Sequence, residues 1–295
     1  MNIAILTTCY NRKDKTLQCL LSVHQCSLPK STTISVVLVD DGCSDGTGDL
    51  IKTAFPDTEV IRGNGDLYWN GGMRLAFAMA MQKKYDYYLW LNDDTMLYPD
   101  AISRLLFTAQ NAILRDGKPA VIVGTTEAHD GSAATYGGLQ RTSRWHPFKY
   151  RLGLATDVPI ACDTMNGNCV LIPDEIARNI GNLDVAFIHT MGDIDYGLRA
   201  RKAGFGIYAM PGFAGQCDRN KEDNSSIGMG FSKRFRRLLG KKGLPLGPWY
   251  VFTRRHGGAF WPVYWMWPTG KLTLSIMRET LQRLFSFLFY PRYEP

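Results

Sequence analysis

Short apolar segments alternate with helix-like segments through the first 126 residues, and this alternation limits the fold more than any other feature. Apolar runs bounded by polar turns predict strands, and apolar residues at helical spacing predict helices between them. The strands are expected at 3–8, 34–42, 58–62, 86–92 and 120–126, and the helices at 17–24, 44–55, 72–84 and 99–113. This order predicts an α/β fold, with a Rossmann-like, mostly parallel sheet flanked by helices on both faces.

Polar side chains gather where three of these strands end. They are Thr7, Tyr10 and Arg12 after the first strand, Asp40 and Asp41 after the second, and Asn92, Asp93 and Asp94 after the fourth. Ligands of such sheets bind beyond the carboxyl ends of the strands. Three polar clusters at one edge favour a site over three unrelated strand tips. Adjacent carboxylates repel each other, so either solvent screens the last cluster or a cation lies there.

Charge is divided unevenly along the chain. The formal net charge is +7, but twelve Lys or Arg and two Glu follow residue 232, a balance of +10 that leaves −3 for the rest. Two amphipathic segments in this basic part predict helices, one at 231–242 and one at 272–290. Their apolar residues are Phe231, Phe235, Leu238, Leu239, Leu274, Met277, Leu281, Leu284, Phe285 and Leu288.

Such basic helices, with the aromatic segment FWPVYWMWP between them, are typical of proteins that lie on a bilayer surface. The alternative is that the helices cover the body of the protein or form a homo-oligomer contact. Nucleic-acid binding is not expected, because Leu and aromatic stripes fit lipid or protein better than a phosphate track. The stretch from Asp218 to Pro248 is polar and Gly-rich apart from the first amphipathic segment, and predicts a mobile loop or linker.

Cysteine usage and the absence of sorting signals predict the compartment. The seven cysteines form no C-x-x-C pair and are odd in number, so a reducing compartment is expected. The start MNIAILTTCY lacks the features of a signal peptide, and no apolar run approaches the roughly 18 residues needed to span a bilayer. We therefore expect a cytoplasmic protein, attached peripherally to the inner face of the cytoplasmic membrane.

Five segments in order carry a family resemblance: TTCYNR, VVLVDDGCSDGT, GNGDLYWNGGMR, LWLNDDT and GDIDYGLRARKAGF. Together they resemble glycosyltransferase family 2, the inverting GT-A enzymes, and especially bacterial members that build surface polysaccharides such as the O-antigen of lipopolysaccharide. The resemblance covers roughly residues 1–215. It implies a GT-A domain at 1–217, with a nucleotide-binding half at 1–125 and an acceptor half at 126–217, followed by a basic helical extension at 218–295.

The resemblance implies transfer of a hexose or deoxyhexose from a UDP- or dTDP-sugar to a hydroxyl of a glycan acceptor, which we expect to be lipid-linked. The donor would be held by Thr7, Tyr10, Arg12, Asp40, Asp41, Asn64, Asp66, Asn70, Arg74 and Asp93. Tyr10 can stack on a base, and Arg12 can pair with phosphate. Gly71 and Gly72 are expected to open a helix whose N–H groups face phosphate. Each of these residues taken alone is equally compatible with a polar loop, and Ser44 or Asp45 is expected to cap the helix that follows.

The segment NDDT resembles the D-x-D position of the family, with Asn92 where an Asp is common. The resemblance makes Asp94 the ligand of Mg²⁺ or Mn²⁺, which prefer oxygen. Asp193 falls at the position of the general base, although Gly192 replaces the Glu that precedes it in the family. His189, Asp195 and Asn166 are candidate acceptor contacts, with Asp195 alternatively a helix cap. His189 is alternatively a metal ligand or, as is more common for a lone His, a structural residue. Gln216 and Cys217 stand where many members have a metal-binding His, so water is expected there.

Two other functions remain open from the sequence. A sugar-phosphate nucleotidyltransferase shares this kind of front half, but it needs a Gly-rich, Arg-containing loop directly after the first strand. The segment TTCYNRKDK contains no glycine, which disfavours that class. A nucleotide- or glycan-binding module that has lost catalysis is favoured only by Gly192.

Overall fold

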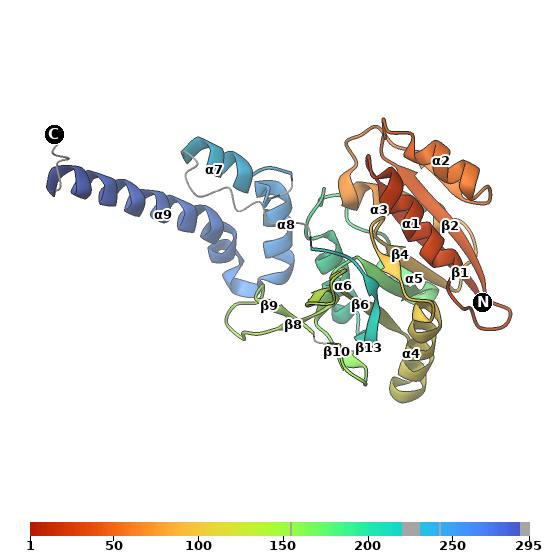
Figure 1. The fold of residues 1–295 in the computed structure, drawn as a ribbon. Helices are drawn as coiled ribbons and strands as arrows, with labels where there is room; N and C mark the ends of the chain where they lie inside the picture. The colour runs from red at the N-terminus through yellow and green to blue at the C-terminus, as the bar shows by residue number, and fades with distance from the viewer. Residues whose placement is uncertain (154, 220–230, 242, 290–295) are drawn as a thin grey trace. The chain divides into compact units, whose positions relative to one another are not determined.

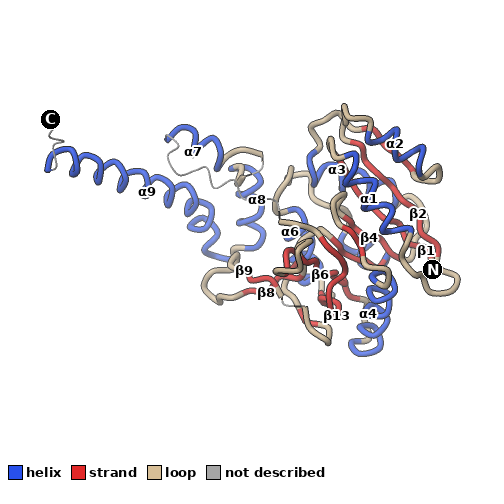
Figure 2. The backbone as a smooth tube through the Cα atoms, in the orientation of Figure 1, coloured by secondary structure: helices blue, strands red, loops and turns tan. Residues whose placement is uncertain are grey.

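The computed structural model describes the whole chain except residues 154, 220–230, 242 and 290–295, and the side chains of 231, 232 and 283–289 (Figure 1). The chain divides into two compact units, residues 1–221 and residues 222–295. The first unit is built around one large mixed sheet, and the described part of the second is helical (Figure 2).

Ten strands of the described residues form the large sheet, in the order β10-β13-β6-β12-β4-β1-β2-β3, with β5 beside β13 and β7 beside β6. The strands are β1 Asn2–Cys9, β2 Thr33–Asp40, β3 Glu59–Arg62, β4 Tyr87–Leu91, β5 Met96–Leu97, β6 Ala120–Glu127, β7 Ala134–Tyr136, β10 Ile160–Ala161, β12 Cys169–Pro173 and β13 Gly206–Gln216. A second sheet joins β8 Gly138–Arg141 to β9 Tyr150–Leu152 and β11 Thr164–Met165. Strands β3, β2, β1 and β4 run parallel, whereas β12 lies antiparallel between β4 and β6.

Helices cover both faces of the large sheet (Figure 1). The helices of this unit are α1 Lys13–His24, α2 Thr47–Ala54, α3 Tyr68–Ala80, α4 Ala101–Asp116, α5 Asp174–Ile180 and α6 Gly192–Lys202. Residues alternate across strand β1: Ile3 and Ile5 pack with α1 and α4, while Ala4 and Leu6 pack with α3, α5 and α6. This period of two divides the buried apolar residues into one core on each face.

The sequence predicts the Rossmann-like arrangement correctly, with each of the five expected strands present. It misses the short strands between residues 134 and 165, the helix α5 and the long strand β13. Helix α3 corrects one expectation, because it begins at Tyr68 and places Gly71 and Gly72 inside the helix. A Cβ on Gly72 would lie 2.1 Å from Thr8 Oγ1, so this glycine serves close packing against β1 rather than an anion site.

The described part of the second unit consists of α7 Phe231–Leu238, α8 Leu246–His256, a short 3₁₀ helix at Gly258–Phe260 and α9 Trp261–Phe289. The loop expected up to Pro248 is therefore wrong near its end, and its residues 220–230 lie outside the described part. The indole of Trp249 donates to Tyr264 O at 3.2 Å, and Arg234 pairs with Glu279 at 2.7 Å, so α8 and α7 both contact α9. Among the residues described, no helix combines the length and apolarity that crossing a membrane requires.

Candidate active site

The guanidinium of Arg12 lies between the two carboxylates, Asp93 and Asp94, that follow strand β4. Its Nη1 atom is 3.1 Å from Asp93 Oδ1 and 2.7 Å from Asp94 Oδ2. Both carboxylates are buried, with 6% of Asp93 and 8% of Asp94 exposed. Arg12 therefore supplies the positive charge that the crowded tip requires, where the sequence suggests a bound cation or solvent. Arg12 is also the residue expected to bind phosphate, and it contacts Asp94, the residue expected to bind the metal.

Burial dominates the electrostatics of Asp93. The pKa of this carboxyl is raised to about 7: removal from water is the largest cause, Arg12 opposes it, and the nearby charge of Asp94 adds to the rise. Desolvation outweighs the ion pair because the carboxylate has lost most of its hydration and shares its guanidinium with a neighbour. The carboxyl of Asp93 therefore takes up a proton near neutral pH.

The second oxygen of Asp94 faces a cysteine. Cys217 Sγ lies 3.5 Å from Asp94 Oδ1 and 3.6 Å from Asn168 Nδ2, and burial together with Asp94 raises the pKa of the Cys217 thiol to about 12. A neutral thiol is a poor ligand for a hard cation, but the carboxylate oxygens of Asp93 and Asp94 are suitable ligands for Mg²⁺ or Mn²⁺. The donor set therefore fits such an ion, which would take the place of the Arg12 or Cys217 contact at Asp94.

Asp41 organises the Gly-rich loop through backbone hydrogen bonds. Its Oδ1 atom accepts from Gly65 N at 2.9 Å, and Oδ2 accepts from Leu67 N at 3.0 Å and Tyr68 N at 3.1 Å. These amides precede or open helix α3, so Asp41 ties the start of α3 to the end of β2. The carboxylate expected to contact the donor is instead largely engaged by the protein, and Asp41 positions the loop.

Asp40 and Asp45 accept backbone hydrogen bonds in the turn after β2. Asp40 Oδ1 accepts from Cys43 N at 2.7 Å, and a Cβ on Gly48 would lie 2.2 Å from its Oδ2. Asp45 accepts from Thr47 N at 3.0 Å at the start of α2 and from Lys13 N at 3.1 Å at the start of α1. The N-cap residue of α2 is Gly46 and not Ser44 or Asp45 as expected, and the Asp45 carboxylate instead binds the first amide of each helix.

Trp69 joins the tip of β4 to the start of α6, and the sequence does not single it out. Its Nε1 donates to Asn92 Oδ1 at 2.7 Å. A Cβ on Gly167 would lie 2.4 Å from the Trp69 ring and 3.3 Å from Asp193 Cβ, so only glycine fits between these two side chains. A tryptophan within a loop of glycines and polar residues was the signal that could have identified it, because an indole N–H there needs an acceptor.

Asp193, the expected base, lies in the first turn of α6. Its Oδ2 accepts from Gly167 N at 2.9 Å, and its Oδ1 accepts from the amide of Ile194 at 2.8 Å. Burial raises the pKa of this carboxyl, although the two amides act in the opposite direction. The next residue after Gly167 is Asn168, whose carbonyl accepts from Asn92 N at 2.9 Å. The 167–168 backbone thus connects the expected base to Asn92, Asp93 and Asp94, the residues after strand β4 that we call the acidic tip.

Asn70 and Gly192 form a matched pair. Asn70 is fully buried, and its Nδ2 donates to Phe187 O at 2.7 Å and Asp184 O at 3.1 Å. A Cβ on Gly192 would lie 1.7 Å from Asn70 Oδ1. Asn70 is therefore a structural residue that holds the 184–188 segment, which corrects its expected donor contact. The glycine that replaces the family Glu is required because Asn70 fills the space a side chain would need.

The other expected donor residues differ in exposure. Thr7 is fully buried, so its side chain does not reach the surface in this structure. Tyr10 is 55% exposed and lies 4.0 Å from the position of a Cβ on Gly65, beside the loop that Asp41 holds. Asn64 and Asp66 are exposed in the same loop, and Arg74 is half-buried on α3.

The expected acceptor residues occupy three different environments. Asp195 is fully buried and pairs with Arg199 at 2.8 Å, so its carboxylate cannot reach an acceptor in this structure and the expectation is corrected. His189 is partly buried, and its ring meets that of Tyr68 edge-on with centroids 6.2 Å apart. Asn166 is partly buried, and its backbone N–H donates to Gly137 O.

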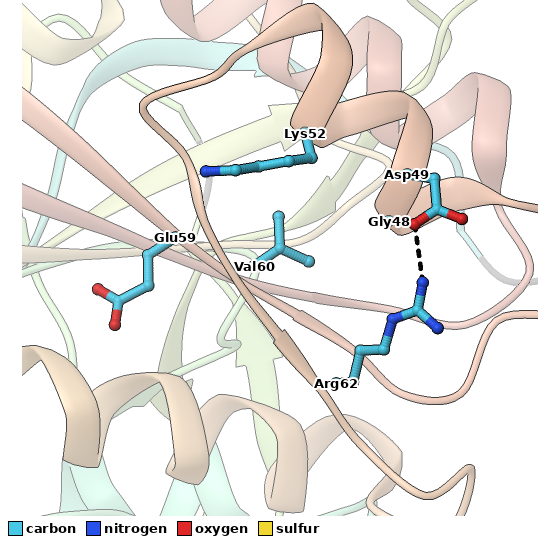
Figure 3. A pocket seen from close by; sticks show the side chains of 6 residues that line it. All are labelled: Gly48, Asp49, Lys52, Glu59, Val60 and Arg62. Atoms are coloured by element: carbon cyan, nitrogen blue, oxygen red, sulfur yellow. Dashed lines mark hydrogen bonds and ion pairs between the residues drawn. The ribbon is translucent and has the colours of Figure 1, made fainter.

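A surface hollow of about 370 Å³ lies between α2 and β3 (Figure 3). Its lining residues are Gly48, Asp49, Lys52, Glu59, Val60 and Arg62. The Asp49–Arg62 ion pair at its wall is solvent-exposed at both ends, with 78% and 72% of the side chains accessible. None of the expected site residues lines this hollow. We therefore place the candidate site at the strand tips, where buried carboxylates converge, and not here.

Comparisons with known proteins agree with the fold. The family model described as glycosyl transferase family 2 matches residues 4–173. TarS of S. aureus superposes with a TM-score of 0.51 at 12% identity, over 86% of this chain and 42% of TarS. The mannosyltransferase PcManGT from Pyrobaculum calidifontis, in complex with GDP-Man and Mn²⁺, superposes with a TM-score of 0.52 at 13% identity. That match covers 89% of this chain and 67% of PcManGT. No curated protein sequence matches the chain significantly.

Proposed function

Because this chain belongs to glycosyl transferase family 2, we propose that it is an inverting glycosyltransferase that moves a sugar from a nucleotide-sugar donor to a hydroxyl of a glycan acceptor. The observation that carries the proposal is the framework that joins Asp193 to the acidic tip. Asp193 binds Gly167 N, the adjacent Asn168 binds Asn92, and Trp69 spans from Asn92 to the Gly167–Asp193 contact. These contacts support the proposal because they link segments about 100 positions apart along the chain.

Asp193 is proposed as the general base. Its carboxylate takes the proton of the acceptor hydroxyl while that oxygen forms a bond to the anomeric carbon. The bond from the anomeric carbon to the diphosphate breaks at the same time, and its electron pair leaves with the diphosphate. Attack from the opposite face inverts the carbon, and no covalent enzyme intermediate is needed. Burial raises the pKa of Asp193, which makes the carboxylate a stronger base while the amides of Gly167 and Ile194 fix its orientation.

Asp94, assisted by Asp93, is proposed to hold Mg²⁺ or Mn²⁺. The bound ion would supply Lewis-acid stabilisation of the departing diphosphate. The Mn²⁺ in the PcManGT complex supports this choice of ion class. Arg12 neutralises Asp93 and Asp94 and stands ready to pair with phosphate, since a guanidinium binds phosphate and carboxylate oxygens alike. The exposed ring of Tyr10 is proposed to stack on the base of the donor.

The donor is proposed to be a UDP- or dTDP-sugar carrying a hexose or deoxyhexose, and the acceptor a lipid-linked glycan of a bacterial surface polysaccharide. Helix α9 supports attachment to a membrane surface. Leu274, Met277 and Leu281 stand 67%, 55% and 64% exposed at heptad spacing. The net charge of +10 after residue 232 complements anionic lipid. The same charge repels the corresponding segment of a second copy of the chain. The proposed location is the cytoplasmic face of the membrane.

A donor panel tests the reaction. The purified chain is incubated with Mn²⁺ and UDP-, dTDP- and GDP-sugars, and release of nucleoside diphosphate is measured with and without glycan acceptors. We expect slow release from one donor, accelerated by an acceptor, and inversion at the anomeric carbon of the product. Asp193→Asn serves as the matched control for background hydrolysis. Binding of a donor without release under any condition would favour the non-catalytic binding module instead.

A further inference from the structure

Two thiols and a carboxylate that do not belong to the acidic tip converge where strands β1 and β2 end. Cys9 is the last residue of β1 and lies opposite Asp40, the last residue of β2, in the parallel register. Cys43 follows in the next turn. The Sγ atoms of Cys9 and Cys43 are 3.8 Å apart, and ligand atoms of all three residues lie within 4.8 Å of one another.

We propose that Cys9, Cys43 and Asp40 bind a thiophilic divalent cation of the Zn²⁺ class. Tetrahedral Zn²⁺ with Zn–S bonds of about 2.3 Å requires two sulfurs about 3.8 Å apart. The observed separation of 3.8 Å meets this requirement without movement of the cysteines. A disulfide would instead need the sulfurs at about 2.05 Å, and it would make no use of Asp40.

Backbone amides orient two of the three ligands, Cys43 and Asp40, from outside. Asn11 N donates to Cys43 Sγ at 3.1 Å, and Cys43 N donates to Asp40 Oδ1 at 2.7 Å. Such outer contacts fix ligand direction and stabilise the negative charge of a thiolate. Asn11 holds a positive φ of 50°, a conformation that Asn tolerates better than most residues, and this places its amide against the sulfur.

Access and ligand chemistry separate this site from the acidic tip. Cys9 is only 2% exposed, while Cys43 is half-buried, so an ion enters from the side of Cys43. Burial is the main cause that raises the pKa of the Cys9 thiol, and the nearby Cys43 raises it further. The thiol is therefore protonated in the free protein, and the cation displaces its proton on binding. Two sulfurs with one oxygen favour Zn²⁺ or Cd²⁺, whereas the carboxylates of Asp93 and Asp94 favour Mg²⁺ or Mn²⁺.

Cadmium binding to the full chain tests the site. The reduced, metal-free protein is titrated with Cd²⁺ without nucleotide, and the ultraviolet absorption of cadmium–thiolate bonds and the bound stoichiometry are measured. We expect one tightly bound ion in the wild type. Cys43→Ser should weaken binding by more than about a hundredfold, since loss of a ligand exceeds the 10- to 100-fold cost of losing an outer contact.

Two cysteine variants provide the controls. Cys162→Ser changes a buried cysteine outside both sites, and Cys217→Ser changes the thiol beside Asp94. Both should keep the cadmium signal of the wild type. An unaltered affinity in Cys43→Ser, the absence of thiolate absorption in the wild type, or loss of the signal in Cys217→Ser alone would each overturn the proposal. Cys9→Ser gives a second test of the same ligand set if Cys43→Ser does not fold. The readout requires no sugar transfer, so it fails or succeeds independently of the proposed reaction.

Discussion

Arg12 donates through a single nitrogen, Nη1, to Asp94 Oδ2 at 2.7 Å and to Asp93 Oδ1 at 3.1 Å. One guanidinium thereby holds two adjacent buried carboxylates, which would otherwise repel each other. Removing the cation from such a cluster is costly because it leaves charge buried without a partner. The Arg12 side chain is itself 36% exposed, so solvent recovers part of that cost.

Arg12→Met should destabilise the protein in EDTA by roughly 1–3 kcal/mol, less than the 3–5 kcal/mol typical of fully buried pairs. Adding Mn²⁺ should recover more stability in this variant than in the wild type, because the ion replaces the missing guanidinium at Asp93 and Asp94. Thermal unfolding with EDTA and with Mn²⁺ measures both effects. Arg62→Met removes the exposed pair with Asp49 and should change little in either condition. Equal Mn²⁺ effects in Arg12→Met and wild type would separate Arg12 from the cation site.

The sequence anticipates which segments form the site better than it anticipates what each side chain contacts. Strand tips collect Arg12, Asp93 and Asp94 as expected, because parallel strands end at one edge of the sheet. Whether a carboxylate such as that of Asp41 binds a ligand or three backbone amides depends on the path of the loop after Gly63, which local pattern does not encode. The antiparallel strand β12 likewise depends on long-range pairing with β4 and β6.

The close contact between Asn70 and Gly192 is a second feature that the sequence alone does not predict. The replacement of the family Glu by Gly192 looks like a loss when the α6 segment is considered alone. The compensating residue lies more than one hundred positions earlier, in α3, and its buried amide fills the space beside Gly192. Only the folded chain brings the two together, so no spacing rule along the sequence reveals the connection.

Asp93 predicts how stability depends on pH. Its pKa rises to about 7 on folding, from the ordinary value of 3.8 for an Asp carboxyl. Between these values the folded state binds a proton that the unfolded state has released, so stability falls as pH increases from about 4 to 7 and then levels off. Asp93→Asn removes this contribution, so its stability relative to wild type should rise across that window by up to about 4 kcal/mol. Urea unfolding in EDTA at several pH values measures this difference in the free energy of unfolding.

The matched control for this pH experiment is Asp157→Asn, which changes an exposed carboxylate. Its stability should follow the wild type at every pH. A constant difference between Asp93→Asn and wild type from pH 4 to 7 would show that the pKa of Asp93 does not rise on folding.

Asp193→Asn should lower the rate of transfer by about 10²- to 10⁴-fold, the usual contribution of a positioned base. Donor affinity should be unchanged, because the carboxylate acts on the acceptor hydroxyl. Turnover and donor binding by calorimetry are measured on the same preparation. Asn replaces one carboxylate oxygen by an NH₂ group, so the hydrogen bond from Gly167 N can persist through the remaining oxygen. Near-normal turnover in this variant would mean that another group accepts the proton.

Gly192→Ala tests the close contact at the start of α6. The new Cβ would lie 1.7 Å from Asn70 Oδ1, and relieving that overlap should cost about 1–3 kcal/mol. In Asn70→Ala the space is empty, so adding Gly192→Ala to it should cost much less than in the wild type. Unfolding of both single variants and the double variant gives the coupling energy. Gly270→Ala, where no neighbouring atom lies within 4 Å, is the control. Additive costs in the double variant would contradict the pairing.

Replacing Leu274, Met277 and Leu281 by Ser should reduce binding to membranes while leaving the charge of the chain unchanged. The three side chains are exposed on α9 and form the apolar part of the proposed lipid contact, so their loss removes burial that the basic residues cannot replace. Co-sedimentation with vesicles rich in anionic lipid measures binding, and vesicles of neutral lipid should retain little of the wild type. Phe107→Ser with Leu114→Ser removes two exposed apolar side chains from α4 and should sediment as the wild type does. If the α9 variant sediments as fully as the wild type, the apolar stripe serves another partner, and a smaller apparent mass of that variant in solution would identify a second copy of the chain.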